Sequence, residues 1–157
     1  MIVVSNTSPL CYLAWIEALD IMPVLFGTLK IPTSVLEELT GRGTPENVRQ
    51  HFIPPPNWLQ VKQFSPATNI NLTRLHRGEQ DAIMLAETIS ADLILLDDRD
   101  ARQNALDRGL NVTGLIGILT TASQQNLLNL TNAVEKLLKT SFRIKPQLLK
   151  QILEQER

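Results

Sequence analysis

Acidic and amide side chains stand directly after short apolar runs in this sequence, and such side chains are able to bind a metal ion. Asp97 and Asp98 follow the apolar run 93–96, and Asp100 comes two residues later. Asn6 follows a β-branched run at the beginning of the chain. Carboxylate and amide carbonyl oxygens are ligands that Mg²⁺ and Mn²⁺ prefer in proteins. The pattern therefore indicates hard-cation chemistry.

Two further pairs of acidic residues lie in segments with a helical pattern. Glu37 and Glu38 are neighbours, about 100° apart around a helix, so they are not expected to point at the same place. Glu79 and Asp81 begin an amphipathic segment whose apolar face includes Ala82. Each pair also has a structural interpretation, as solvated acids or, for Glu79, as a first-turn acid that stabilises the helix dipole. Clustered carboxylates repel one another, and a bound cation removes that cost.

The elements that must position these residues alternate between strands and helices. This alternation predicts a mostly parallel central sheet covered by helices on both faces, a three-layer α/β/α architecture. Functional groups in such sheets collect beyond the carboxyl ends of the strands. We expect a single domain over residues 1–157, with residues 41–57 irregular. The predicted strands cover 2–5, 29–31, 93–96 and 111–113, with an edge strand at 59–64, and the predicted helices cover 9–19, 20–26, 32–39, 78–90, 98–106, 114–125, 130–139 and 146–154.

Capping residues predict where two of these helices begin. Ser8 is a suitable N-cap, with Pro9 at the first helical position. Either Asp97 or Asp98 is expected to cap the helix over 98–106. The other carboxylate, at the end of a buried strand, is then left for another role.

The composition excludes several kinds of site. The 157 residues carry a formal net charge of −1, so a net basic footprint for nucleic acid is absent. Cys11 is the single cysteine, which excludes an internal disulfide, and its apolar neighbours predict a buried structural thiol. His51 and His76 lack the spacing of zinc ligands. We find no signal peptide and no apolar run of roughly 18 residues, so a cytoplasmic location is expected.

Four motifs in order resemble those of the PIN-like domains, and most closely the small prokaryotic branch that includes VapC-type toxin ribonucleases. A later segment, Val-Thr-Gly-Leu-Ile-Gly-Ile-Leu, also fits that branch. The resemblance covers nearly the full chain and is weakest over residues 41–72. The four motifs are Ser-Asn-Thr-Ser-Pro-Leu at 5–10, Ile-Pro-Thr-Ser-Val-Leu-Glu-Glu-Leu at 31–39, Gly-Glu-Gln-Asp-Ala-Ile at 78–83 and Leu-Ile-Leu-Leu-Asp-Asp-Arg-Asp-Ala-Arg at 93–102.

The resemblance implies hydrolysis of RNA phosphodiesters with Mg²⁺ or Mn²⁺ held by acidic residues. It places the metal ligands at Glu38, Asp81 and Asp98. One position departs from the family pattern, because Asn6 stands where the family has an aspartate. A neutral amide binds a cation more weakly than a carboxylate and would weaken activation of the attacking water. The implied catalytic residues are Asn6, Glu38, Asp81 and Asp98, with Glu79, Asp100 and Thr7 in auxiliary roles.

Two function hypotheses follow from the resemblance. The first is a metal-dependent ribonuclease, the toxin of a toxin–antitoxin pair, with RNA, a cognate antitoxin and a possible second copy of the chain as partners. Arg99 and Arg102 are expected to contact the RNA backbone, with Arg74 and Arg77 as further candidates, although each also reads as ordinary surface charge. The second is a weakened or inactive PIN-like module that binds RNA or a protein.

A receiver-like phosphoacceptor domain is an alternative class, because it also uses carboxylates at strand ends. Here no paired acid follows the first strand and no Lys follows residues 111–113, which argues against that class.

The apolar residues of the last two helices either complete the core or form a dimer surface; they are Leu137, Leu138, Leu148, Leu149, Ile152 and Leu153.

Overall fold

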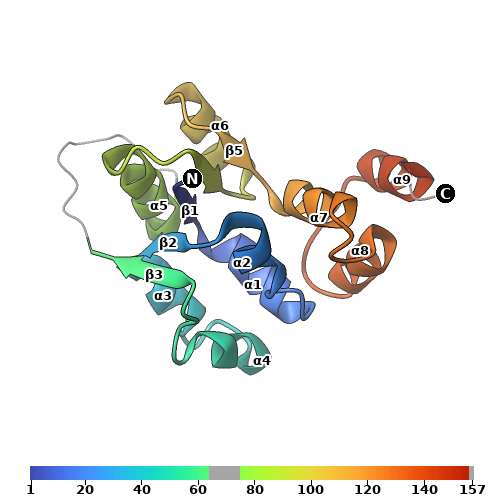
Figure 1. Ribbon diagram of the computed structural model, residues 1–157, viewed down its shortest axis with the longest axis horizontal. Coiled ribbons are helices and arrows are strands. Elements are labelled where there is room, and N and C mark those ends of the chain that lie inside the picture. Colours follow the sequence, from blue (N-terminus) through green and yellow to red (C-terminus); the bar gives the residue numbers. More distant parts are fainter. Residues whose placement is uncertain (64–74, 156–157) are drawn as a thin grey trace.

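A parallel sheet lies at the centre of the computed structural model, which describes residues 1–63 and 75–155 (Figure 1). Its strands stand in the order β3-β2-β1-β4-β5, and each neighbouring pair is parallel. The predicted three-layer α/β/α class is therefore confirmed, and the edge position predicted for the third strand is correct. The strands are β1 Val3–Ser5, β2 Leu29–Pro32, β3 Leu59–Lys62, β4 Leu93–Leu95 and β5 Val112–Thr113.

Helices cover both faces of the sheet (Figure 1). Successive side chains of a strand point to opposite faces, and β1 shows this clearly. Val3 packs in a core with α1, α2, α3, α7 and α8, and Val4 packs in a second core with α5 and α6. The helices are α1 Thr7–Trp15, α2 Ile21–Phe26, α3 Thr33–Leu39, α4 Glu46–Arg49, α5 Arg77–Thr88, α6 Arg99–Asp107, α7 Leu115–Gln124, α8 Leu130–Leu138 and α9 Pro146–Gln155, with a 3₁₀ turn, η1, at Gln50–Phe52.

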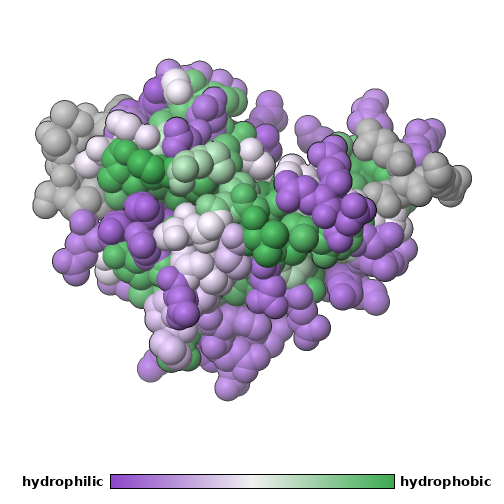
Figure 2. Space-filling model, viewed as in Figure 1, coloured by the Kyte–Doolittle hydropathy of each residue, from purple (hydrophilic) through white to green (hydrophobic). Residues whose placement is uncertain are grey.

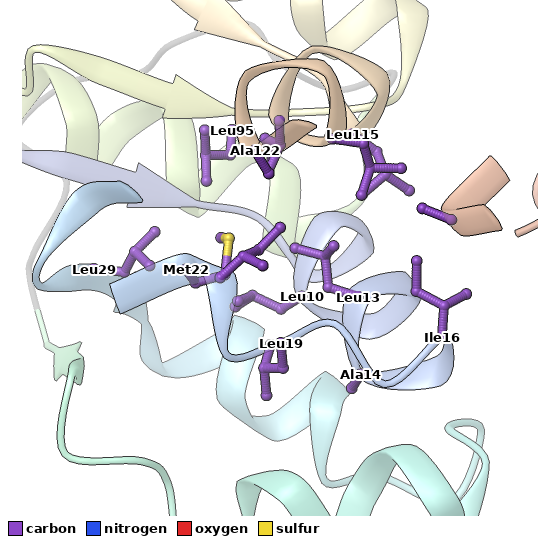
Figure 3. Packing of buried hydrophobic residues seen from close by; sticks show 14 of the residues in the cluster. Leu10, Leu13, Ala14, Ile16, Leu19, Met22, Leu29, Leu95, Leu115 and Ala122 are labelled. Atoms are coloured by element: carbon purple, nitrogen blue, oxygen red, sulfur yellow. The ribbon is translucent and has the colours of Figure 1, made fainter. Parts of the chain in front are cut away.

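The larger core explains the long apolar runs of the first and seventh helices. Figure 3 shows Leu10 and Leu13 of α1 and Met22 of α2 packed beneath the side chains of α7, among them Leu115 and Ala122. Most of these side chains are fully buried. Burial of a leucine side chain stabilises a fold by about 1.5–3 kcal/mol, so this layer fixes α1 firmly behind the sheet.

Two details of the N-terminal half differ from the sequence-based expectation. The helix expected to begin after Ser8 begins at Thr7, with Asn6 as its N-cap and without a side-chain capping bond. The reason is that the backbone N–H of Asn6 still donates to the carbonyl oxygen of Leu95, 3.1 Å away, so the strand passes directly into the helix. Within the segment expected to be irregular, α4 and η1 form, and Phe52 of η1 is buried in the core.

The C-terminal helices divide their apolar residues between core and surface. Leu137 and Ile152 are buried, and Leu149 is partly buried against the larger core. Leu138 and Leu148 are exposed. The tail therefore completes the core in part, as one of the two alternatives predicted. Figure 2 shows further apolar surface in the middle of the view, around the position of α2. Within the described ranges, no helix is long and apolar enough to cross a membrane.

Candidate active site

Side chains from α1 and α3 meet the first turn of α5 at Gly78, on the carboxyl edge of the sheet. A Cβ atom on Gly78 would lie 2.9 Å from Glu38 Oε2, 3.5 Å from Asn6 Oδ1 and 3.6 Å from Thr7 Oγ1. Three oxygen atoms thus line one small space, and it exists because residue 78 carries no side chain. The Thr7 hydroxyl donates to Glu38 Oε2 at 2.9 Å and holds this carboxylate in place.

The backbone around Asn6 fixes its side chain in this space. Asn6 follows β1 directly, and only 3% of its surface is exposed. Its Oδ1 atom is buried and accepts no hydrogen bond from the described residues. An unsatisfied buried acceptor costs about 1–3 kcal/mol, and most such atoms in folded proteins have a partner. The amide oxygen therefore points to a ligand that binds there.

Glu79 brings a second carboxyl group to the same region. It is 7% exposed, and its Oε1 accepts from the backbone N–H of His76 at 3.1 Å. Burial raises the pKa of Glu79, the hydrogen bond from His76 opposes this, and the nearby charges of Asp98 and Glu38 raise it further. The charges of Asp98 and Glu38 thus both act on Glu79, which lies between α3 and the start of α6 in this respect.

The neighbouring aspartates after β4 have separate roles. Asp98 caps α6, as predicted for one of the two, because its Oδ2 accepts from the backbone N–H of Ala101 at 3.0 Å. Asp98 is exposed, and its charge adds to the burial that raises the pKa of Glu79. Asp97, the carboxylate left for another role, accepts through Oδ1 from the N–H of Leu115 at 2.7 Å and fixes the start of α7. Its Oδ2 is buried and has no hydrogen-bond partner among the described residues.

Asp81 contacts α3 beside the cluster. Its Oδ2 accepts from the Ser34 hydroxyl at 2.6 Å and lies 3.7 Å from Nε of Arg77. Ser34 lies one helical turn before Glu38 on α3. Asp81 also lines a cleft of about 590 Å³ beyond β2 and β3, together with Glu37 and Lys62. Glu79 and Asp81 lie about 200° apart around α5, so the two acids face different neighbours.

The remaining predicted residues lie around the cluster. Asp100 and Arg99 are exposed in the first turn of α6. A guanidinium nitrogen of Arg102 lies 3.0 Å from the position that a Cβ on Gly114 would take, and its charge lowers the pKa of Asp97, which burial raises. Arg77 is exposed and paired with Asp81. Arg74 lies outside the described residues.

Cys11 is half-buried, in line with a structural thiol. Burial raises the pKa of its thiol, and the negative charge of Glu38 raises it further. A thiol whose pKa is raised is a poor nucleophile at neutral pH. Cys11 therefore serves packing of α1 against the larger core.

The oxygen atoms near Gly78 suit a hard cation in type. Over residues 1–63 and 75–155, no three His, Cys, Asp or Glu side chains come together in a metal-binding arrangement. The set instead combines the Glu38 carboxylate, the Asn6 amide oxygen and the Thr7 hydroxyl, with Glu79 and Asp98 nearby. Mg²⁺ needs only one or two carboxylates when waters and substrate phosphates complete its shell. The residues present therefore fit such an ion.

Comparison with known proteins agrees with this architecture. The family model DUF3368, described as a PIN domain, matches residues 2–157. A similar solved structure is that of a PilT N-terminus domain protein from the hyperthermophilic archaeon Sulfolobus solfataricus, at a TM-score of 0.54. Its sequence is 19% identical, and the match covers 78% of this chain and 93% of that protein, so the likeness shows the fold. None of the curated proteins matches the sequence significantly.

Proposed function

The chain belongs to the PIN domain family, and on that premise we propose that it is a divalent-metal-dependent ribonuclease that hydrolyses RNA phosphodiesters. PIN domains are commonly nucleases. The observation that carries the proposal is the buried, unpartnered Asn6 Oδ1 facing the Glu38 carboxylate across Gly78. A buried acceptor oxygen without a hydrogen-bond donor, next to a carboxylate, suits a cation that both oxygens bind.

The residues have distinct tasks in this proposal. Glu38 and Asn6 hold Mg²⁺ or Mn²⁺, and Glu79 and Asp98 complete the acidic surroundings. We assign to Glu79 the part expected for Asp81, because Glu79 is buried and the charges of Asp98 and Glu38 act on it. The bound cation supplies activation of the attacking water and neutralises charge on the scissile phosphate. Thr7 positions the Glu38 carboxylate through its 2.9 Å hydrogen bond. Gly78 leaves the space that these oxygens need.

A cleavage assay on single-stranded RNA with Mn²⁺ or Mg²⁺ tests this function. We expect cleavage by the natural protein, its loss in EDTA, and a decrease of about 100-fold or more in Glu38→Gln, since even residues that only support metal ligands cost about 10–100-fold. Glu37→Gln, its neighbour on α3, is the matched control and should retain activity within about 3-fold. Equal activity of Glu38→Gln and the natural protein would refute the site.

A thermal shift with Mn²⁺ gives a second reading that does not depend on catalysis. Ligand at 100 times its dissociation constant stabilises the folded state by about 2.7 kcal/mol. In a domain of this size, this raises the melting temperature by about 5–10 °C. The rise should vanish in Glu38→Gln and persist in Glu37→Gln. Equal rises in both variants would place the ion elsewhere.

The resemblance to VapC-type toxins supports a more specific role. We infer that the enzyme acts in the cytoplasm as the toxin of a toxin–antitoxin pair and is inhibited by a small protein encoded beside it, with a homodimer as its assembly. Induced expression should arrest growth, Glu38→Gln should not, and co-expression of a neighbouring short reading frame should restore growth. Growth arrest that persists in Glu38→Gln would contradict the toxin role.

Asn6 favours one alternative, a PIN module that binds RNA or a protein without cutting. The amide lacks the charge that an aspartate would bring to the cation, so the chemistry would be weak. If Asn6→Asp gains metal-dependent cleavage that the natural protein lacks, this alternative is supported. Cleavage by the natural protein eliminates it.

A further inference from the structure

A second cleft opens on the other flank of the acidic cluster, beyond the carboxyl ends of β4 and β5. It has a volume of about 580 Å³, and its lining residues come from the start of α7 and from the segment between α8 and α9. In Figure 2 the outline of the molecule is notched between the lobe that carries α6 and the lobe that carries α9. The side chains that matter for its chemistry are Asp97, Arg102, Phe142, Arg143 and Lys145.

The charges in this cleft are unbalanced. Arg102, Arg143 and Lys145 contribute three cations, against the single carboxyl group of Asp97. Asp97 Oδ1 accepts from the backbone N–H of Leu115, and the charge of Arg102 acts on this carboxyl group, while its Oδ2 is buried with no hydrogen-bond partner among the described residues. Arg143 and Lys145 are exposed, and the ion pairs formed within the described chain involve other residues. Two cationic side chains of the cleft are therefore free to bind an anionic partner.

The cleft beyond β2 and β3 differs in this respect. There, Lys62 and Arg77 stand beside Glu37 and Asp81, so the cationic and acidic side chains are equal in number among the residues that the structure describes. Arg77 is moreover paired with Asp81. An anion gains little at such a balanced surface. The attraction for phosphate groups thus lies on the β5 flank of the sheet edge.

The β5-flank cleft also lies in the right place and has the right size for a nucleic-acid strand. Asp97 in its wall is the chain neighbour of Asp98, so the cleft begins one residue from the acidic cluster. Its volume is within the range of small-molecule pockets, which suits one or two nucleotides and is too small for a duplex. The Phe142 ring lines it and is held edge-on against Tyr12 at 5.1 Å.

We propose that the β5-flank cleft binds the backbone phosphates of single-stranded RNA next to the candidate active site, through Arg143 and Lys145. This inference rests on the proposed ribonuclease function and names the flank along which its substrate lies. Phosphate contacts give affinity that depends on salt and not on base sequence. The C-terminal segment before α9 is thereby part of the substrate-binding surface.

The test is binding of a fluorescein-labelled 12-nucleotide single-stranded RNA of random sequence, measured by anisotropy in EDTA at several salt concentrations. Each phosphate contact with a single strand contributes about 0.7 to the slope of log affinity against log salt. The double variant Arg143→Ala/Lys145→Ala should therefore lower the slope by about 1.4 and the affinity at 0.1 M salt about 25-fold. Arg143→Lys/Lys145→Arg keeps both charges and should retain binding.

The matched control removes two exposed cations that line neither cleft, Lys136 of α8 and Lys139 directly after it. Lys136→Ala/Lys139→Ala should change the affinity by less than about 2-fold, because exposed charges that do not contact the phosphates are screened at this ionic strength. If the natural protein binds RNA and the Arg143/Lys145 variant binds it equally well, the inference is wrong while the ribonuclease function stands. The cleft would then suit an acidic protein segment. If the natural protein binds no single-stranded RNA in EDTA, this inference is wrong, and the cleavage assay with Mn²⁺ decides the ribonuclease function separately.

Discussion

Two pairs of acidic residues lie on the same two helices, α3 and α5, but differ in their surroundings, so residue type alone does not decide which acids form the site. Glu38 of α3 and Glu79 of α5 form an inner pair beside Asn6, where Glu79 is nearly buried and Thr7 holds Glu38. Glu37 and Asp81 form an outer pair that lines an open cleft with cationic side chains. The pairs differ in which side of each helix faces the carboxyl edge of the sheet. The rotation of each helix about its own axis thus decides which of its acidic residues can join the site.

The largest effect expected from this comparison concerns α5. Glu79→Gln removes a nearly buried carboxyl group of the inner pair and should lower kcat for RNA cleavage by about 10–100-fold, the range seen when groups around a metal site are removed. Asp81→Asn keeps the hydrogen bond from Ser34 and should leave kcat within about 3-fold. Single-turnover cleavage with Mn²⁺ measures both. A larger loss in Asp81→Asn would reverse the assignment and restore the one made from the sequence.

A middle-sized effect concerns the space between the inner pair and Asn6. A methyl group at residue 78 would lie 2.9 Å from Glu38 Oε2, so Gly78→Ala should displace the Glu38 carboxylate from Thr7 and change the free energy of unfolding by about 1 kcal/mol or less, since the displaced atom is the end of a flexible side chain. Gly43→Ala adds a methyl group with no atom within 4 Å and is the matched control. Urea unfolding measures both variants. Equal midpoints would show that the inner space is not tightly filled.

The smallest effect uses Cys11 as a reporter of which glutamate faces inward. The charge of Glu38 raises the pKa of the Cys11 thiol, so Glu38→Gln should lower that pKa and speed alkylation by iodoacetamide about 2–3-fold at pH 8. Glu37→Gln should leave the rate unchanged. Both measurements belong in EDTA, so that metal does not mask the charge. The same acceleration in both variants would mean that Cys11 senses α3 as a whole.

Much of the fold could be predicted from the sequence, because strands and helices here differ clearly in apolar pattern. The runs over residues 2–5 and 93–96 became parallel neighbours, with Ser5 opposite Leu95. The helix after the first strand was misplaced because Ser8 satisfies the local rules of an N-cap, whereas the actual cap, Asn6, is set by a hydrogen bond to a distant strand. Local capping rules do not include that long-range bond.

The site was predictable in part for the same reason. The strands that precede Asn6, Glu38 and Asp98 are neighbours in the predicted parallel sheet. The topology therefore brings these three residues to the same edge of the sheet. The choice between Glu79 and Asp81 depends on how α5 rotates against its neighbours, which the sequence leaves open. The signal that favours Glu79 is Gly78 beside it, because a residue without a side chain marks close approach of other groups. Arg143 lies between helices, where periodicity gives no guidance.

The amide at residue 6 affects the stability of the protein when no cation is bound. An aspartate in the same nearly buried position would add a negative charge beside Glu38 and Glu79, and the metal-free protein would then suffer more repulsion. Asparagine avoids that repulsion, and under the proposed function it would bind the cation more weakly than an aspartate. A protein of this kind would stay folded when divalent cations are scarce, and its activity would follow their local concentration.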